Sequence, residues 1–297
     1  MGTTRPLDPV LRARLHLAEG ARVRLGVIRA VLGTVDGISR GVTGKPFFAL
    51  REAEDLLRQI DGVQGAALVR EILRWRGGTQ IDALGLGHVP PSGAVVIAAT
   101  HPTGMFDFIA HAGALLSHRP DLKVVANQEV EVFLGPDILV PVQIDKGNRA
   151  RSPNAVHSGM QRHLEQGGAL LIFGSGRVPD RRAGKLVEPA WRSGASRISA
   201  SCGAPIVPAA LEACNSDYYY RLRRVAQTLK RGDDNFGAMV GSLRYMAEFL
   251  DKLGGQYVVH YGSALPPGTS PAVLKDCAEG LVPGLYQKPD AHLCDGI

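Results

Sequence analysis

The sequence contains little cysteine, few aromatic residues and no long apolar run. Four cysteines occur among its 297 residues, and no two of them form a Cys-x-x-Cys pair. We therefore expect reduced thiols in a reducing compartment, and neither a disulfide framework nor a zinc site. No run approaches the roughly 18 apolar residues of a membrane span, and the first residues lack the apolar centre of a signal peptide. These absences predict a cytoplasmic protein without a bound metal.

Nucleic acid is a poor candidate partner for this chain. Aromatic residues make up 6% of it, and no motif interleaves them with basic residues as nucleic-acid-binding sequences do. The net charge is +6, so we expect anionic partners such as phosphorylated cosubstrates or anionic lipid surfaces. With 45% hydrophobic and 21% charged residues, the composition is typical of a globular chain with one large domain or at most two.

The hydrophobic pattern divides the chain into three segments. Residues 1–78 show helical periodicity and form an N-terminal helical segment. Residues 79–265 alternate strand-like and helical runs, as expected of an α/β core. Among the strand-like runs are residues 123–127, 169–173 and 205–211, and Pro208 within the last of these predicts a bulge or an edge strand. Residues 266–297 form a tail that we expect to pack on this core.

One helix of the N-terminal segment, residues 21–38, is basic and amphipathic. Leu25, Ile28 and Leu32 share a face, while several arginines supply charge. Two interpretations compete: the helix packs against the rest of the protein, or it lies on an anionic membrane. Three glycines weaken it as an autonomous surface helix, so we favour packing.

The most strand-like run ends at a histidine that is followed closely by an aspartate. Residues 94–100 are short, apolar and β-branched, which predicts a buried parallel strand, and a helix is expected from about Met105. His101 then follows the strand and Asp107 lies in the first helical turn, at the sheet edge where α/β proteins bind ligands. A carboxylate that fixes the imidazole tautomer makes the ring a general base. The alternative is a polar turn residue beside a charge at a helix N-terminus.

The sequence around this pair resembles a known family. Residues 100–107, THPTGMFD, resemble the first block of the glycerolipid (PlsC-like, lysophospholipid) acyltransferase superfamily, which usually reads HxxxxD. The five residues between His101 and Asp107 resemble the HPxGxxD form of the hemolysin-like and ornithine-lipid-type branch. The resemblance extends to the second block at residues 144–149, the third at residues 173–178 and the fourth at residues 206–209. In the third, Gly174 replaces the usual proline, and the family's acidic residue is missing.

The resemblance implies a fold, a reaction and a set of site residues. The expected fold is a mixed, mostly parallel central sheet flanked by helices, as in PlsC-like acyltransferases. The expected reaction moves a fatty acyl group from an acyl-CoA or acyl carrier protein thioester to a hydroxyl or amine of a lysophospholipid-like acceptor. His101 would be the general base and Asp107 would orient it, with no cofactor beyond the cosubstrate. The implied substrate-binding residues are Thr103, Gly104, Arg149, Gly174, Ser175, Gly176 and Arg177.

The physical chemistry of the third block fits an anion. A Gly-Ser-Gly turn lets backbone amides approach a negative charge, and a planar guanidinium at Arg177 suits a phosphate. Arg149, and more weakly Lys146, follow a strand in the second block and are further candidates. The alternative for all three is a solvated basic loop. The basic charge also suits a peripheral contact with the inner face of an anionic membrane.

Two other functions compete with acyl transfer. The first is a lipid-binding or scaffold protein that keeps the fold without the activity. The second is a serine α/β-hydrolase that uses Ser175. Its nucleophile elbow would read GxSxG, but Phe173 stands where the first glycine belongs, and the best histidine precedes the serine. We expect His157 and His163, which do not follow a strand, to be surface or packing residues.

Overall fold

A computed structural model describes residues 5–15, 17–127, 134–142 and 153–287 of the chain. By its internal contacts the chain forms two compact units. The helical unit comprises Met1–Thr79 and Asn215–Gly255, and the α/β unit comprises Gln80–Cys214 and Gln256–Ile297. The segment Asn215–Gly255, which the sequence analysis placed within the 79–265 core, thus packs with the N-terminal helices.

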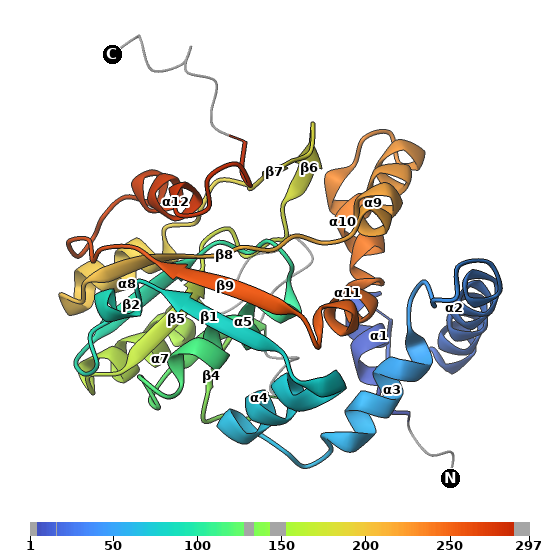
Figure 1. The fold of residues 1–297 in the computed structure, drawn as a ribbon, viewed down its shortest axis with the longest axis horizontal. Coiled ribbons are helices and arrows are strands. Elements are labelled where there is room, and N and C mark those ends of the chain that lie inside the picture. Colours follow the sequence, from blue (N-terminus) through green and yellow to red (C-terminus); the bar gives the residue numbers. More distant parts are fainter. Residues whose placement is uncertain (1–4, 16, 128–133, 143–152, 288–297) are drawn as a thin grey trace. The chain divides into compact units, whose positions relative to one another are not determined.

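The α/β unit is built on one central sheet (Figure 1). Its strands, in spatial order, are β1 (Gln80–Leu84), β9 (Gln256–Tyr261), β8 (Ile206–Leu211), β2 (Val95–Ala99), β5 (Ala169–Phe173), β3 (Lys123–Asn127) and β4 (Leu139–Val142). All neighbouring pairs are parallel except β8 and β9. A separate antiparallel hairpin joins β6 (Asp180–Arg182) to β7 (Lys185–Val187). The expected mixed, mostly parallel sheet is confirmed.

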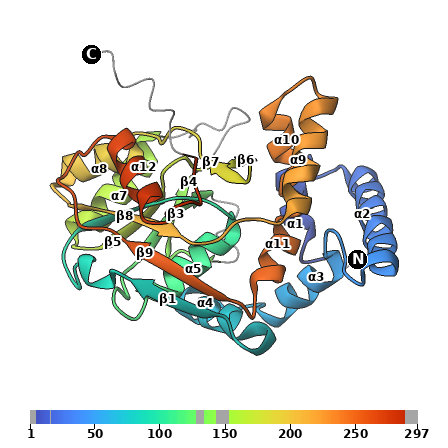
Figure 2. The same cartoon turned by 45° about the horizontal axis from the view of Figure 1, so that its top comes forward.

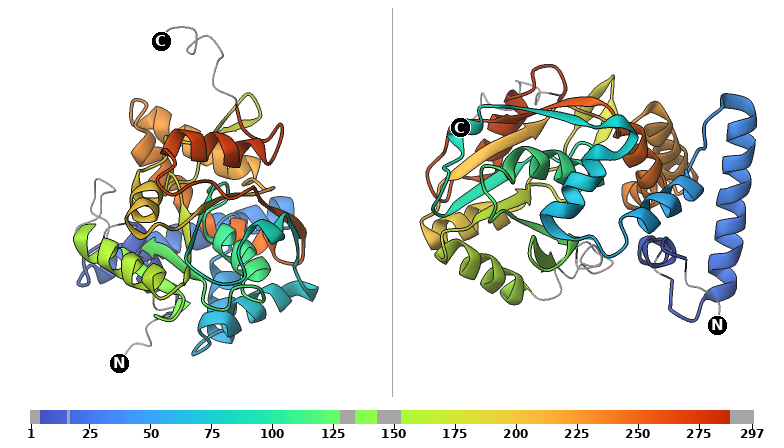
Figure 3. Two further views of the ribbon diagram at one scale, coloured as in Figure 1. Left: turned by 90° about the vertical axis from the view of Figure 1, so that its left-hand side faces the viewer. Right: turned by 60° about the horizontal axis from the view of Figure 1, so that its bottom comes forward.

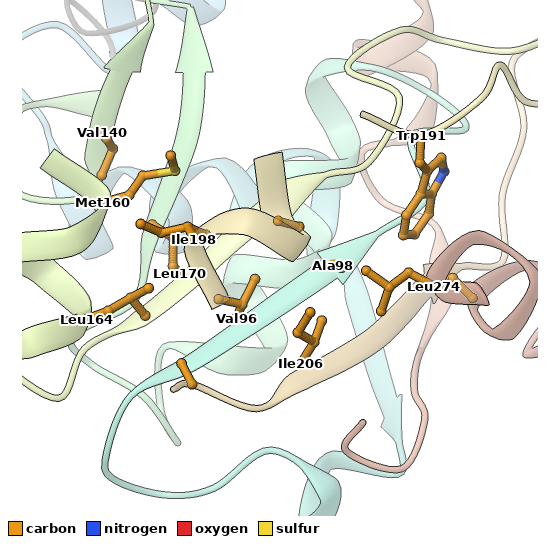
Figure 4. Close-up of a cluster of buried hydrophobic side chains, with 13 residues drawn as sticks. Val96, Ala98, Val140, Met160, Leu164, Leu170, Trp191, Ile198, Ile206 and Leu274 are labelled. Carbon is orange, nitrogen blue, oxygen red and sulfur yellow. The ribbon is translucent and has the colours of Figure 1, made fainter. Parts of the chain in front are cut away.

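Helices cover both faces of the sheet (Figures 2 and 3). Helix α5 (Met105–Leu115) packs on β1, β8 and β9. The other face carries α7 (Pro153–Glu165), α8 (Gly194–Cys202) and α12 (Pro271–Gly280). Because side chains alternate along a strand, Val96 and Ala98 of β2 point to this second face, where they join a buried cluster with Leu170, Ile198 and Leu274 (Figure 4). Strand β2 is fully buried, as the apolar run predicted.

Pro208 lies in the interior of the sheet, contrary to the sequence-based expectation of a bulge or an edge strand. Strand β8 is buried throughout and runs in unbroken register with β2, with Ala98 opposite Pro208. On its other side, the Pro208 carbonyl accepts a hydrogen bond from Gly262 N at 2.8 Å. Gly262 follows the last residue of β9, so the missing proline N–H falls where that ladder has ended.

The helical unit contains α1 (Asp8–Arg14), α2 (Arg22–Thr43), α3 (Leu50–Gln59), α4 (Gly65–Arg74), α9 (Asp217–Leu229), α10 (Asp234–Ser242) and α11 (Tyr245–Lys252). Helices α9 and α10 pack side by side (Figure 2). The buried carboxylate of Asp36 in α2 accepts hydrogen bonds from Phe48 N and Leu50 N at 2.5 and 2.9 Å, and so caps the start of α3.

Helix α2 has two different apolar faces. Leu25 and Leu32 are buried, as the packing interpretation predicted. A second face is exposed, with side chains between 56% and 81% accessible: Val23, Val27, Val31, Ile38 and Val42. Among the described residues, none of the helices combines the length and apolar character that a membrane span requires.

Candidate active site

The predicted pair lies where β2 passes into α5. Strand β2 ends at Ala99 and α5 begins at Met105, so residues 101–104 form the connecting turn, called here the His101 turn. Gly104 has φ 92°, a left-handed conformation that disfavours other residues. The His101 side chain is 18% exposed and that of Asp107 is fully buried. The turn therefore presents the imidazole and hides the carboxylate behind it.

The two side chains face each other closely. His101 Nδ1 lies 2.9 Å from Asp107 Oδ2. Among the described residues, no acceptor is aligned with the His101 Nδ1–H as a hydrogen bond requires. A small rotation of the ring is needed to complete the hydrogen bond to Asp107. Catalytic hydrogen bonds are often poorly aligned before substrate binds. The pairing also leaves Nε2 as the nitrogen that can meet a substrate.

The Asp107 carboxylate is held by the turn itself. Thr103 N lies 3.1 and 3.0 Å from its two oxygens, and Gly104 N donates to Oδ2 at 3.0 Å. The Thr103 hydroxyl donates to Oδ1. These donors fix the orientation of the carboxylate. Thr103 and Gly104 were predicted to bind substrate; in the structure their amides and the Thr103 hydroxyl contact the Asp107 carboxylate.

Two rings pack around the pair. The Phe173 ring stacks on His101 with centroids 4.5 Å apart. His111 follows Asp107 by one helical turn, is fully buried, and lies with Nδ1 3.2 Å from the Tyr261 hydroxyl. Burial lowers the pKa of His111 to about 4, so this imidazole is neutral at physiological pH. His111 is not predicted from the sequence; its spacing of four residues from Asp107 was the available signal.

The third sequence block lies beside the first because β2 and β5 are neighbours. Ala99 is opposite Phe173, and Gly174 N donates to Ala99 O at 2.9 Å. Gly174 lies against the Trp191 ring, so that a Cβ at this position would come within 2.0 Å of it. This contact explains why a glycine occupies the position.

The Gly174 turn, residues 174–177, differs from expectation in its hydrogen bonding. Gly176 N donates to Phe173 O at 3.1 Å, and Arg177 N donates to Ser175 Oγ at 3.2 Å. These amides, like that of Gly174, are used within the protein. Ser175 Oγ in turn donates to Arg177 O at 2.9 Å, and no histidine of the described ranges bonds to it. The arrangement gives the hydrolase hypothesis no support.

Two guanidinium groups lie near this turn. Arg192 N donates to Gly174 O at 2.9 Å, and the guanidinium carbon of Arg192 lies 3.9 Å from where a Cβ of Gly176 would be. Burial, and next the charge of Arg177, lower the pKa of Arg192. Two like charges in electrostatic reach of each other form a site that favours an anion. Arg177 was predicted from the sequence, but Arg192 was not, because it follows a tryptophan outside the four sequence blocks.

The remaining predicted residues lie elsewhere. Arg149 and Lys146, with the whole second block, lie outside the described residues. His163 on α7 lies with Nε2 3.0 Å from Ala169 O, at the start of β5 and so at the opposite end of that strand from Phe173. Within the described ranges, no three His, Cys, Asp or Glu side chains come together as a metal site requires.

Part of this chain is similar in sequence to known acyltransferases. The crystal structure of the 1-acyl-sn-glycerophosphate (LPA) acyltransferase PlsC from Thermotoga maritima aligns over 93% of each chain, with 13% sequence identity and a TM-score of 0.45. No curated protein matches the sequence. A family model described as Acyltransferase matches residues 80–212. The stretch that carries the His101 turn, the Gly174 turn and β8 is therefore similar to the acyltransferase family.

Proposed function

We propose that this chain transfers a fatty acyl group from an acyl thioester, on coenzyme A or acyl carrier protein, to a hydroxyl or amine of a lysophospholipid-like acceptor. The observation that carries the proposal is the placement of His101 and Asp107. A partly exposed imidazole lies 2.9 Å from a fully buried carboxylate that turn amides hold in place. The match of residues 80–212 to the acyltransferase model supports the reaction class.

The pair performs the proton transfers of this reaction. His101 Nε2 takes the proton of the acceptor as its oxygen or nitrogen attacks the thioester carbonyl, and Asp107 stabilises the imidazolium that forms. When the tetrahedral intermediate collapses, the carbon–sulfur bond breaks and the imidazolium returns the proton to the thiolate. The acceptor is acylated directly, so the reaction needs no acyl-enzyme.

Arg177 and Arg192 are the groups we assign to the negatively charged part of the substrates. Their guanidiniums suit the phosphate of an acceptor or the acidic groups of a carrier thioester. The amides of Gly174 and Gly176 are already bonded within the protein, so we do not assign them to the oxyanion.

The exposed face of α2 supports a peripheral contact with the inner face of an anionic membrane. Val23, Val27 and Val31 lie on one side of this helix and are largely exposed, and Arg22 and Arg24 beside them are exposed as well. An apolar stripe next to basic side chains suits the interface of an anionic bilayer. The proposed location is the cytoplasmic side of the membrane.

The test compares the purified protein with two histidine variants. Acyl-CoA or acyl carrier protein is supplied with and without a lysophospholipid extract, thiol release is followed, and the product is identified by mass spectrometry. We expect acceptor-dependent thiol release that His101→Ala reduces by at least about 100-fold, the scale of general-base catalysis. His157→Ala, on the outer helix α7, is the matched control and should keep the rate.

Two results would contradict the proposal. Near-normal transfer by a folded His101→Ala variant would remove His101 from the mechanism. Binding of lipid or thioester without any thiol release would favour the non-catalytic lipid-binding or scaffold protein instead.

A further inference from the structure

A buried carboxyl group lies behind the His101 turn. Glu188 follows β7 directly and is only 6% exposed. Its Oε1 accepts a hydrogen bond from Trp191 Nε1 at 2.9 Å. Its Oε2 is buried and has no aligned hydrogen-bond partner in the described part of the chain, although the Ser175 hydroxyl and the His101 backbone amide face the carboxyl closely enough to act on its charge. Glu188 therefore touches both turns of the site.

We propose that Glu188 is a positioning residue for the transfer reaction: its carboxyl, fixed by Trp191, lies between the His101 turn and the Gly174 turn and holds them in register. The inference rests on the proposed function. Glu188 contacts the backbone at His101, so it acts through that residue and does not itself touch the reacting atoms.

The segment of residues 188–192 is attached firmly to the Gly174 turn. The Trp191 ring packs directly on Gly174, and Arg192 N donates to Gly174 O at 2.9 Å. The same indole donates to Glu188, which fixes the carboxyl relative to this turn. The carboxyl then reaches the His101 amide on the neighbouring strand end. One short segment thus connects the two turns whose spacing the reaction depends on.

A second segment supports the carboxyl from the C-terminal side. Leu186 N donates to Leu285 O and Gln287 N donates to Leu186 O, both at 2.9 Å, so residues 285–287 pair with β7. This pairing buries Tyr286, whose hydroxyl faces Thr100 and Glu188. Thr100 directly precedes His101. The polar groups behind the His101 turn therefore come from the turn itself, from β7 and from residues 285–287.

The buried setting favours the uncharged form of the carboxyl. Burial raises the pKa of Glu188 to about 8, the charge of Glu279 adds to the shift, and Trp191, Ser175 and the His101 amide oppose it. Tyr286 faces the carboxyl too, and burial holds its pKa well above the usual value. A neutral carboxyl can accept and donate hydrogen bonds at once, and it places no second negative charge near Asp107.

Two substitutions at Glu188 separate positioning from mere structural support. Glu188→Gln keeps the size and the neutral polar character of the side chain, whereas Glu188→Ala removes both. The matched control is Glu165→Gln, which changes another carboxyl of the α/β unit, at the end of α7, where Oε1 accepts a hydrogen bond from Gln161 at 2.7 Å. Acyl transfer is measured between pH 6 and pH 9, and folding is checked by thermal melting.

We expect a split between kcat and KM. Glu188→Ala should lower kcat at pH 7 by at least about tenfold with KM within about twofold, because the turn around His101 loosens while substrate contacts remain. Glu188→Gln should keep kcat within about threefold at pH 7. The unmodified protein should lose rate as Glu188 ionises near pH 8 and places a second negative charge near Asp107, and Glu188→Gln should lack this fall. Glu165→Gln should keep both kcat and KM.

Three results would overturn the inference: a folded Glu188→Ala variant with normal kcat, a change in KM alone, or a Glu188→Gln variant as slow as Glu188→Ala. If Glu188→Ala does not fold, the pH profile of Glu188→Gln decides, and an unchanged alkaline fall in rate counts against it. If the unmodified protein transfers no acyl group, the proposed function fails, and nuclear magnetic resonance still tests the positioning. The ring signal that His101→Ala removes should move in Glu188→Gln and stay in Glu165→Gln; an unmoved signal in Glu188→Gln overturns the inference.

Discussion

Replacing Asp107 with asparagine tests the central pair most directly. The carboxylate is fully buried and receives hydrogen bonds from Thr103 N, Gly104 N and the Thr103 hydroxyl. An asparagine can keep most of this arrangement if its NH₂ group takes the Oδ1 side. There the Thr103 hydroxyl can turn from donor to acceptor. The carbonyl then remains on the Oδ2 side, where Gly104 N donates and His101 faces it.

The expected effects on folding and on rate differ in size. Three charge-assisted hydrogen bonds become neutral or reversed, and the loss is offset by no longer burying a charge, which gives a net cost of about 1–3 kcal/mol. The effect on rate is larger because the imidazolium loses its counter-charge while the tautomer is kept. We expect kcat to fall about 10²- to 10³-fold, equivalent to about 3–4 kcal/mol of transition-state stabilisation.

The assay is thiol release at saturating acyl thioester, with thermal melting measured on the same preparations. Thr103→Val, which removes one hydroxyl donor and leaves the charge, is the matched comparison and should cost less than about tenfold in rate. A folded Asp107→Asn protein whose kcat lies within threefold of the unmodified protein would refute the assignment of Asp107. So would equal losses in the two variants.

Two further predictions concern stability. The buried His111 imidazole binds a proton only near pH 4 in the folded protein but near pH 6.5 in the unfolded chain, so the unfolded state binds more protons in this window. The free energy of unfolding, measured in urea, should therefore fall by about 2 kcal/mol from pH 7.5 to pH 5, and His111→Leu should lack this contribution. The same dependence of the unfolding free energy on pH in both proteins would contradict the prediction. In Gly174→Ala the new methyl group would lie 2.0 Å from the Trp191 ring, so we expect about 1–3 kcal/mol of destabilisation by overpacking. Gly26→Ala in α2 meets no atom within 4 Å and should melt no lower than the unmodified protein, whereas equal melting temperatures for the two alanine variants would disprove the clash.

The buried strands were the most predictable part of this fold. The sequence pattern predicted residues 123–127 and 169–173, and these are the bounds of β3 and β5. Parallel strands that are buried on both sides read as short apolar runs between turn residues, so local sequence is sufficient to find them. The closeness of His101 and Asp107 follows for the same reason, because a strand end and the next helical turn are joined by a few residues.

What the sequence could not predict depends on contacts between distant segments. Glu188 and Tyr286 are unremarkable in the sequence, and they meet behind His101 because residues 285–287 pair with β7. Pro208 predicted a bulge or an edge strand, because proline cannot donate to a sheet. The sequence around it does not show that its missing N–H lies where β9 has ended. The exposed valine face of α2 was not predicted, because the regularly spaced apolar residues of the buried face already accounted for the helical pattern.

The order of strands in the sheet has a consequence for how the protein folds. Strand β1 lies at the sheet edge and is joined to it through β9, so that Gln80 pairs with Gln256. Between them along the chain lie β2 to β8 and the helices α9 to α11 of the other unit. Closing so long a loop carries a large entropic cost and slows folding. Strand β2, which leads to His101, pairs with β5 and β8 and not with β9, so the strands around the candidate site can assemble before β9 and β1 complete the sheet.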